Sequence, residues 1–231
     1  NDWVELDAGE ARVYADAVGR RHFADMRRAA YAPVGAVTAK LDRLRDIVAE
    51  SAADGWKVVV FSQFLDVIAA ISTALAKSPQ MVLTGSTSAG RRQEAIDRFT
   101  AHHGHLVLIG QIQAIGEGIN LQAASVVVLA EPALKPSTEE QAIRRVYRMG
   151  QARSVQVHRL LAKDSVDGHL EAMLHDKRKL FRAYAHESDA KRAHSSATDS
   201  SVVDYEVTDV DRERIIDAET ERLRRENRSR L

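Results

Sequence analysis

Residues 57–62 read KVVVFS, an unbroken apolar and largely β-branched run between a lysine and a serine. Such a run is typical of a strand that is buried on both faces of a parallel sheet. More short apolar runs follow it, and most are separated by stretches with helical spacing. The predicted strands cover residues 57–62, 81–84, 106–109, 126–129 and 155–161. Strands that alternate with helices in this way predict an α/β fold, with a parallel sheet flanked by helices.

Helices are also predicted before and after this alternating region. Asp7 and Glu10 have the spacing of a capping box, which predicts a helix over residues 8–18. Two more helices are expected at 23–31 and from Thr38 to about Gly55. We predict four parts: a helical N-terminal segment (1–55), the α/β domain (56–185), a polar linker (186–207) and a charged C-terminal helix (208–231).

The composition limits the chemistry that the chain can use. It has 231 residues, and 45% of them are hydrophobic but only 5% aromatic, so the core must be aliphatic. The absence of cysteine excludes disulfides, thiolate metal sites and cysteine catalysis. No apolar run approaches the roughly 18 to 20 residues that cross a bilayer, so we expect no membrane partner. The chain begins at Asn1 rather than Met, and we expect a fragment of a longer protein.

The charges balance over the whole chain but not along it. There are 33 basic and 33 acidic residues. Residues 141–182 contain ten Lys and Arg against four Asp and Glu, whereas residues 186–220 contain four against ten. A basic region followed by an acidic tail is a real pattern. We expect the acidic stretch 199–219 to pack near the basic motif QAIRRVYRMGQ at 141–151.

Polar loops follow the predicted strands at the edge where parallel sheets bind ligands. Ser62 and Gln63 end the first buried strand. The loop at 85–88, GSTS, offers hydroxyls and backbone N–H groups before a helix N-terminus, which suits an anion, although an ordinary helix cap is about as good an explanation. Arg91 and Arg92 in the first turn of that helix are easier to explain if an anion lies nearby.

The loop after the third strand, residues 110–124, reads GQIQAIGEGINLQAA. Gly116 and Gly118 would let a nucleotide approach the backbone, and Asn120 offers donors and an acceptor. A pair of glycines can equally be a simple turn.

A helix is predicted over residues 137–150, with Glu140 placed to complete a capping box. Arg145 and Arg148 are three residues apart and share a face with Gln141, one turn earlier. Two guanidiniums and an amide on one face form a donor array suited to phosphate oxygens. A solvated basic face is the alternative interpretation.

Several sequence motifs that bind nucleotides or metal ions are absent from this chain. No stretch fits GxxxxGK[ST], and no acidic pair stands where a magnesium site would be expected. His102, His103 and His105 lie close together in the sequence but lack carboxylate or cysteine partners, so we predict no metal site. The chain can therefore supply phosphate-binding arginines but not a magnesium–triphosphate cradle.

Four blocks occur in the order KVVVFSQF, LTGSTSAGRRQEAIDRF, IGEGINLQAASVVVLAEP and QAIRRVYRMGQ. Together they resemble the second RecA-like lobe of Swi/Snf-type ATPases, which are helicase-like DNA translocases of superfamily two. The similarity continues through VQVHRLLAKDSVDGHLEAML and covers roughly residues 57–184. Residues 3–14 resemble the segment that leaves the first lobe. The residues of the blocks resemble those of bacterial members of the family.

The resemblance implies a role for each candidate residue. Arg145 and Arg148 would be arginine fingers that reach ATP and Mg²⁺ held mainly by the absent first lobe, and Gln141 would support them. Gly116, Gly118 and Asn120 would line the nucleotide side of the cleft. The residues expected on the track of double-stranded DNA are Ser62, Gln63, Gly85, Ser86, Thr87, Arg92 and Gln111. The implied partners are DNA and the first RecA-like lobe, in the cytoplasm or at a bacterial nucleoid.

The sequence departs from the family pattern in two places. The family's acidic-Pro-x-Trp-Asn-Pro element reads EPALKP at 131–136, without the tryptophan. In the glycine-rich loop, Gln111 and Gln113 replace Ser/Thr-type residues and Ile115 replaces a glycine. These departures leave open a non-catalytic nucleic-acid or protein interaction module derived from the lobe. An RNA-unwinding enzyme of the same superfamily fits less well, because its arginine motif usually has a His/Gly-rich form.

Overall fold

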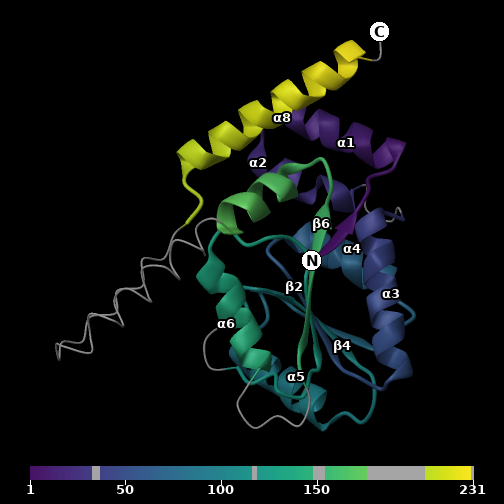
Figure 1. The fold of residues 1–231 in the computed structure, drawn as a ribbon. Coiled ribbons are helices and arrows are strands. Elements are labelled where there is room, and N and C mark those ends of the chain that lie inside the picture. Colours follow the sequence, from purple (N-terminus) through teal and green to yellow (C-terminus); the bar gives the residue numbers. More distant parts are fainter. Residues whose placement is uncertain (33–36, 116–118, 148–153, 176–205, 230–231) are drawn as a thin grey trace, which may run out of the picture.

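The computed structural model describes residues 1–32, 37–115, 119–147, 154–175 and 206–229 (Figure 1). Its centre is one six-stranded sheet in the order β1-β6-β5-β2-β4-β3, and every pair of neighbours is parallel. The strands are β1 (Asp2–Val4), β2 (Val58–Ser62), β3 (Gln80–Leu83), β4 (Val107–Gln111), β5 (Val126–Leu129) and β6 (Gln156–Ala162). The predicted parallel α/β sheet is confirmed.

The KVVVFS stretch forms the strand on which the sheet is centred. β2 pairs with β4 on one side and β5 on the other, with Val58 opposite both Val107 and Val126. All five residues of β2 are buried. Because side chains alternate along a strand, Val58 and Val60 enter one core and Val59 and Phe61 enter another.

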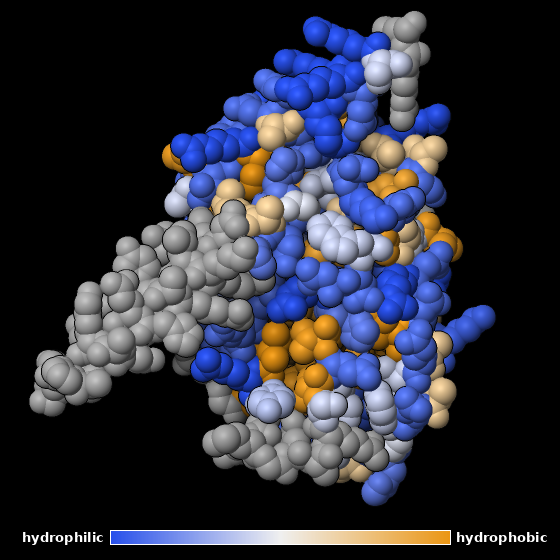
Figure 2. Space-filling view, viewed as in Figure 1, coloured by the Kyte–Doolittle hydropathy of each residue, from blue (hydrophilic) through white to orange (hydrophobic). Residues whose placement is uncertain are grey.

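Helices cover both faces of the sheet (Figure 1). The first core joins the strands to α3 (Ala39–Ala53) and α4 (Leu65–Ala74). The second joins them to α5 (Ala89–Ala101) and α6 (Pro136–Val146). In the view of Figure 2, apolar side chains are visible in the lower part of the molecule, whereas the surface at the top is mostly hydrophilic.

A third core joins the two ends of the described chain. It contains α1 (Ala8–Gly19), α2 (Phe23–Arg28), the helix at 166–175 and α8 (Asp209–Ser229). A short 3-10 helix, η1 (Ala29–Tyr31), continues α2. Figure 1 shows α8 lying across α1, away from α6. The expected packing near the basic motif is therefore wrong for residues 209–219, because Ile215 and Ile216 of α8 are buried in this third core, beside the helix at 166–175.

The N-terminal segment is not wholly helical as predicted. Residues 2–4 form β1, which extends the sheet beside β6. Asp2 also accepts hydrogen bonds from Arg43 at 2.8 and 2.9 Å and lies 3.0 Å from Nδ1 of His158. The segment thus contributes an edge strand as well as helices.

The bounds of α6 also differ from the prediction. The helix begins at Pro136 after Lys135, which forms no side-chain cap. Glu140 completes no capping box and pairs instead with Arg144. The helix ends at Val146, four residues before the predicted end at Gly150, which lies outside the described residues. Within the described residues, no helix is long and apolar enough to cross a membrane.

Candidate nucleic-acid interface

The carboxyl ends of β2, β4 and β3 lie next to one another in the sheet. Gln111 at the end of β4 joins them: its Oε1 accepts a hydrogen bond from the Gly85 amide at 3.1 Å, and its Nε2 donates to the Gln63 carbonyl at 3.3 Å. Three predicted positions from three separate strands therefore meet at one edge. We call Gln63, the turn at 84–87 and Gln111 the strand-end edge.

The turn at 84–87 is held by its own polar groups. Thr87 Oγ1 accepts from the Thr84 amide at 3.1 Å, and the hydroxyls of Thr84 and Ser86 lie 2.8 Å apart. Arg92 donates to the Thr87 carbonyl at 3.0 Å. Gly85 and Ser86 remain exposed. The arginine therefore fixes the turn, and the backbone of the turn faces solvent.

Ser62 has an internal role. It is buried, and its hydroxyl donates to Oε1 of Glu131 at 2.8 Å. The backbone N–H of Gln63 donates to the same oxygen at 2.5 Å. Ser62, which was expected on the DNA track, therefore lies beneath the surface of the protein, and its hydroxyl is bonded inside it.

A buried arginine approaches the strand-end edge from α2. Arg27 donates from Nη1 to Oε1 of Gln63 at 3.1 Å and from Nη2 to the Pro132 carbonyl at 2.5 Å. Its guanidinium carbon lies 5.1 Å from the centre of the Phe64 ring. Burial raises the pKa of Glu131, while the positive charge of Arg27 and the two hydrogen bonds at Oε1 oppose that rise.

A second pair of buried charges lies beside Arg27 and Glu131. Lys40 Nζ is 2.6 Å from Oδ2 of Asp167, and both side chains are almost fully buried. The same carboxylate oxygen accepts from the Ala162 amide at 2.9 Å, and Tyr31 donates to the Ala130 carbonyl at 2.5 Å. Arg27, Lys40, Glu131 and Asp167 form what we call the buried charge cluster.

The sequence analysis missed the role of every member of this cluster. One signal could have found Lys40: it precedes Leu44 by four residues, so a lysine lies on the apolar face of its helix. Such a position is rarely charged unless a partner is buried with it. The other members carry no comparable local signal.

The nucleotide-side candidates are only partly described. Asn120 is exposed and makes a local turn with Gln122, accepting from its amide at 3.0 Å. The neighbouring Leu121 amide donates to the Arg145 carbonyl at 3.0 Å, which ties this loop to the last turn of α6. Gln141 is exposed on the same helix and Arg145 is half-buried. Gly116, Gly118 and Arg148 lie outside the described residues.

These groups suit a phosphate but not a metal. Guanidinium and amide donors fit anionic oxygens. Among the described residues, no group of three or more His, Cys, Asp or Glu side chains could hold a metal ion.

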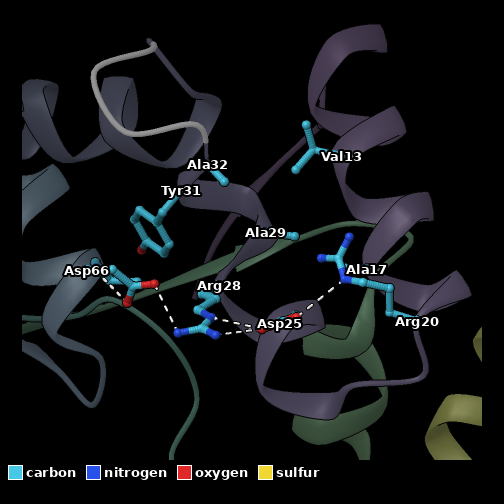
Figure 3. A pocket seen from close by; sticks show the side chains of 10 residues that line it. Val13, Ala17, Arg20, Asp25, Arg28, Ala29, Tyr31, Ala32 and Asp66 are labelled. Carbon is cyan, nitrogen blue, oxygen red and sulfur yellow. Dashed lines mark hydrogen bonds and ion pairs between the residues drawn. The ribbon is translucent and has the colours of Figure 1, made fainter.

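A cavity of about 260 Å³ lies between α1, α2, η1 and the start of α4 (Figure 3). Arg28 spans it, with Nη2 2.5 Å from Asp25 and Nη1 3.0 Å from Asp66. Arg20 lies 3.5 Å from the other oxygen of Asp25. Hydrogen bonds from Arg28 lower the pKa of Asp25 to about 2. The charges drawn around this cavity pair with one another, so they fix α2 against α4.

Comparison with known proteins adds a family to this geometry. Residues 39–150 match the helicase conserved C-terminal domain. The chain is 31% identical over 145 residues to an uncharacterized ATP-dependent helicase of Mycoplasma genitalium. This alignment covers 62% of the chain and 14% of the relative. The chain is also 31% identical over 140 residues to ATP-dependent helicase fft3 of Schizosaccharomyces pombe, covering 60% and 15%. The chain thus spans only about one seventh of the length of these relatives.

A solved structure shares the fold. The SWI2/SNF2 ATPase core of Sulfolobus solfataricus, determined in complex with double-stranded DNA, aligns with a TM-score of 0.62 and 25% identity. The alignment covers 77% of this chain and 43% of that one. The parallel sheet, the matched domain and these relatives together support a helicase C-terminal lobe of the Swi/Snf type, with a RecA-like fold.

Proposed function

We propose that this lobe is the second motor lobe of an ATP-dependent DNA translocase. The observation that carries the proposal is the strand-end edge, which gathers Gln63, Gly85 and Gln111 from three parallel strands in the same domain as α6. The names of the relatives and the DNA-bound neighbour support it. In this proposal the edge follows the phosphate backbone of double-stranded DNA, and the contacts are largely independent of base sequence.

The other half of the proposal concerns the nucleotide. Arg145 and Arg148 act as arginine fingers on ATP that the first RecA-like lobe holds with Mg²⁺. Gln141, Asn120, Gly116 and Gly118 line the same cleft. Positioned guanidiniums stabilise the charge that develops on the transferred phosphoryl group. ATP supplies the free energy, and opening and closing of the two lobes moves the protein along DNA.

The test compares three arginines in the full-length protein. Arg145→Ala and Arg148→Ala should each lower DNA-stimulated ATP hydrolysis by about a thousandfold or more, as loss of an arginine finger does elsewhere. Arg144→Ala is the matched control, because Arg144 is exposed and pairs with Glu140 one turn away at 3.5 Å. It should hydrolyse ATP at the wild-type rate. Wild-type turnover in both finger variants would refute the arginine-finger role.

The alternative is an interaction module that has lost its motor. Its support is the altered glycine-rich loop and the missing tryptophan, but Ile115 of that loop is buried in the second core, where it packs over Gly110. That departure serves packing and says nothing against ATP hydrolysis. A full-length wild-type protein that binds DNA but shows no DNA-stimulated hydrolysis would favour the alternative.

A further inference from the structure

The Gln63 side chain has one end engaged and one end unengaged. Its Oε1 accepts from Arg27 at 3.1 Å. A guanidinium can only donate, so the amide oxygen must face Arg27 and the amide nitrogen must face away. The side chain is partly exposed, and no described residue accepts a hydrogen bond from its Nε2. Two N–H donors are therefore presented at the strand-end edge.

The rest of Gln63 is also held. Its backbone N–H donates to Glu131 at 2.5 Å, and its carbonyl accepts from Gln111 at 3.3 Å. Arg27 itself is buried and anchored by the Pro132 carbonyl at 2.5 Å. Three of the four polar groups of Gln63 are therefore held, two in its backbone and one in its side chain, and the residue loses little freedom when the fourth binds a ligand.

We propose that Arg27 is a positioning residue that orients the Gln63 amide so that its NH₂ group donates to a phosphate oxygen of the DNA backbone. Phosphate oxygens only accept hydrogen bonds, so the opposite orientation of the amide would repel them. Arg27 acts through Gln63 and does not itself reach the DNA. This inference rests on the proposed function and assigns one donor and its support within the DNA site.

Two variants of the full-length protein test the orientation. The measurement is the affinity for one double-stranded DNA at fixed salt, by fluorescence anisotropy. Gln63→Ala should weaken binding by about five- to tenfold, the effect of losing one hydrogen bond to a charged group. Gln63→Glu should weaken it further, because Arg27 would keep one carboxylate oxygen and the other would face the phosphate. A merely structural role predicts the reverse order, since the ion pair with Arg27 would hold the edge together.

A double-mutant cycle tests whether Arg27 acts through Gln63. Arg27→Lys keeps the charge beside Glu131 but cannot keep both forked hydrogen bonds, and it should weaken DNA binding by about as much as Gln63→Ala. In the Gln63→Ala background it should add less than about a twofold loss. Arg28→Lys is the control: it is the next residue of the same helix, pairs with Asp25 and Asp66, and should leave DNA affinity within about twofold of wild type.

The outcomes separate this inference from the proposed function. Additive losses in the cycle, or wild-type affinity in Gln63→Glu, would overturn the positioning role. If the wild-type protein is stimulated by DNA while all Gln63 variants bind DNA normally, only this inference fails. If the wild-type protein neither binds DNA nor is stimulated by it, the proposed function fails as well. Thermal unfolding of each variant shows whether Arg27→Lys is folded, and the Gln63 variants decide the question if it is not.

Discussion

Two lysine–carboxylate pairs in this molecule have nearly the same geometry and very different surroundings. Lys40 and Asp167 are 2.6 Å apart with side chains 0% and 2% exposed, whereas Lys163 and Glu5 are 2.8 Å apart with side chains 50% and 78% exposed. Water solvates the second pair whether or not it forms, so it contributes little. In the first pair each ion depends on the other, because neither can regain water without local unfolding.

We therefore expect Lys40→Met to lower the free energy of unfolding by about 3–5 kcal/mol, because Asp167 would stay buried without its counter-ion. Lys163→Met removes the same side chain from the exposed pair and should cost less than about 1 kcal/mol. Urea unfolding of the two variants and the wild type measures both values. Equal costs would show that burial does not decide the strength of these pairs.

At the scale of elements, the sequence predicts what local residues determine. The capping box of Asp7 and Glu10 is present, because its atoms are three residues apart. β2 and the four strands after it were found from their apolar runs. β1 was missed because it has three residues and its partner β6 is far away in the sequence. The buried charge cluster was missed for the same reason: its members lie at positions 27, 40, 131 and 167.

The candidate site divides in the same way. The strand ends were predicted because parallel strands place their following loops at one edge. The inward direction of the Ser62 hydroxyl could not be predicted, because it depends on Glu131 in another loop. The early end of α6 could not be predicted from the sequence either, because the residues around Tyr147 have helical spacing although Tyr147 itself has an extended backbone (ψ 121°).

One contact between elements explains a departure from the family pattern. A Cβ at Gly110 in β4 would lie 2.1 Å from Cδ1 of Ile115, which is 1% exposed. Gly110→Ala should therefore destabilise the protein by about 1–3 kcal/mol through overpacking. Adding Ile115→Ala should return part of that loss, so that the double variant is more stable than the sum of the two single effects.

The control for this pair is Gly90→Ala in the first turn of α5, where a Cβ would meet nothing within 4 Å. Because alanine favours the helix over glycine, this variant should be neutral or up to about 1 kcal/mol more stable. Thermal denaturation followed by circular dichroism compares the four variants with the wild type. Strictly additive effects at Gly110 and Ile115 would contradict the packing argument.

At the scale of the whole molecule, the chain after the helix at 166–175 returns to the loop that leads into α6. The Val207 amide donates to the Leu134 carbonyl at 3.0 Å, and Lys135 lies 3.1 Å from Glu206. Leu134 and Lys135 stand where the family pattern has Trp and Asn. Two of the positions that depart from the pattern thus contact the segment before α8, and this segment supports the loop beside the proposed DNA site.

A buried carboxylate also holds α8 to α1 and to the helix at 166–175. Glu219 of α8 accepts hydrogen bonds from Tyr14 and His169, both at 2.9 Å, and from Arg222 at 2.8 Å. Burial opposes its ionisation, yet the hydrogen bonds from His169, Arg222 and Tyr14 lower its pKa to about 2. Glu221, two residues further along α8, is exposed and pairs with Arg225 at 3.0 Å on the surface of the helix.

This difference gives the docking of α8 a pH dependence with a definite sign. The pKa of Glu219 is lower in the folded protein than the usual glutamate value, so its stabilisation is complete above that usual value and is lost as the pH falls towards 2. The loss amounts to about 3 kcal/mol at most.

Glu219→Gln should be less stable than wild type at pH 7 and should lose less stability between pH 5 and pH 2. Glu221→Gln should follow the wild-type curve, because an exposed pair contributes little. Urea unfolding at several pH values measures the three curves, and parallel curves for wild type and Glu219→Gln would show that this carboxylate does not hold α8 in place.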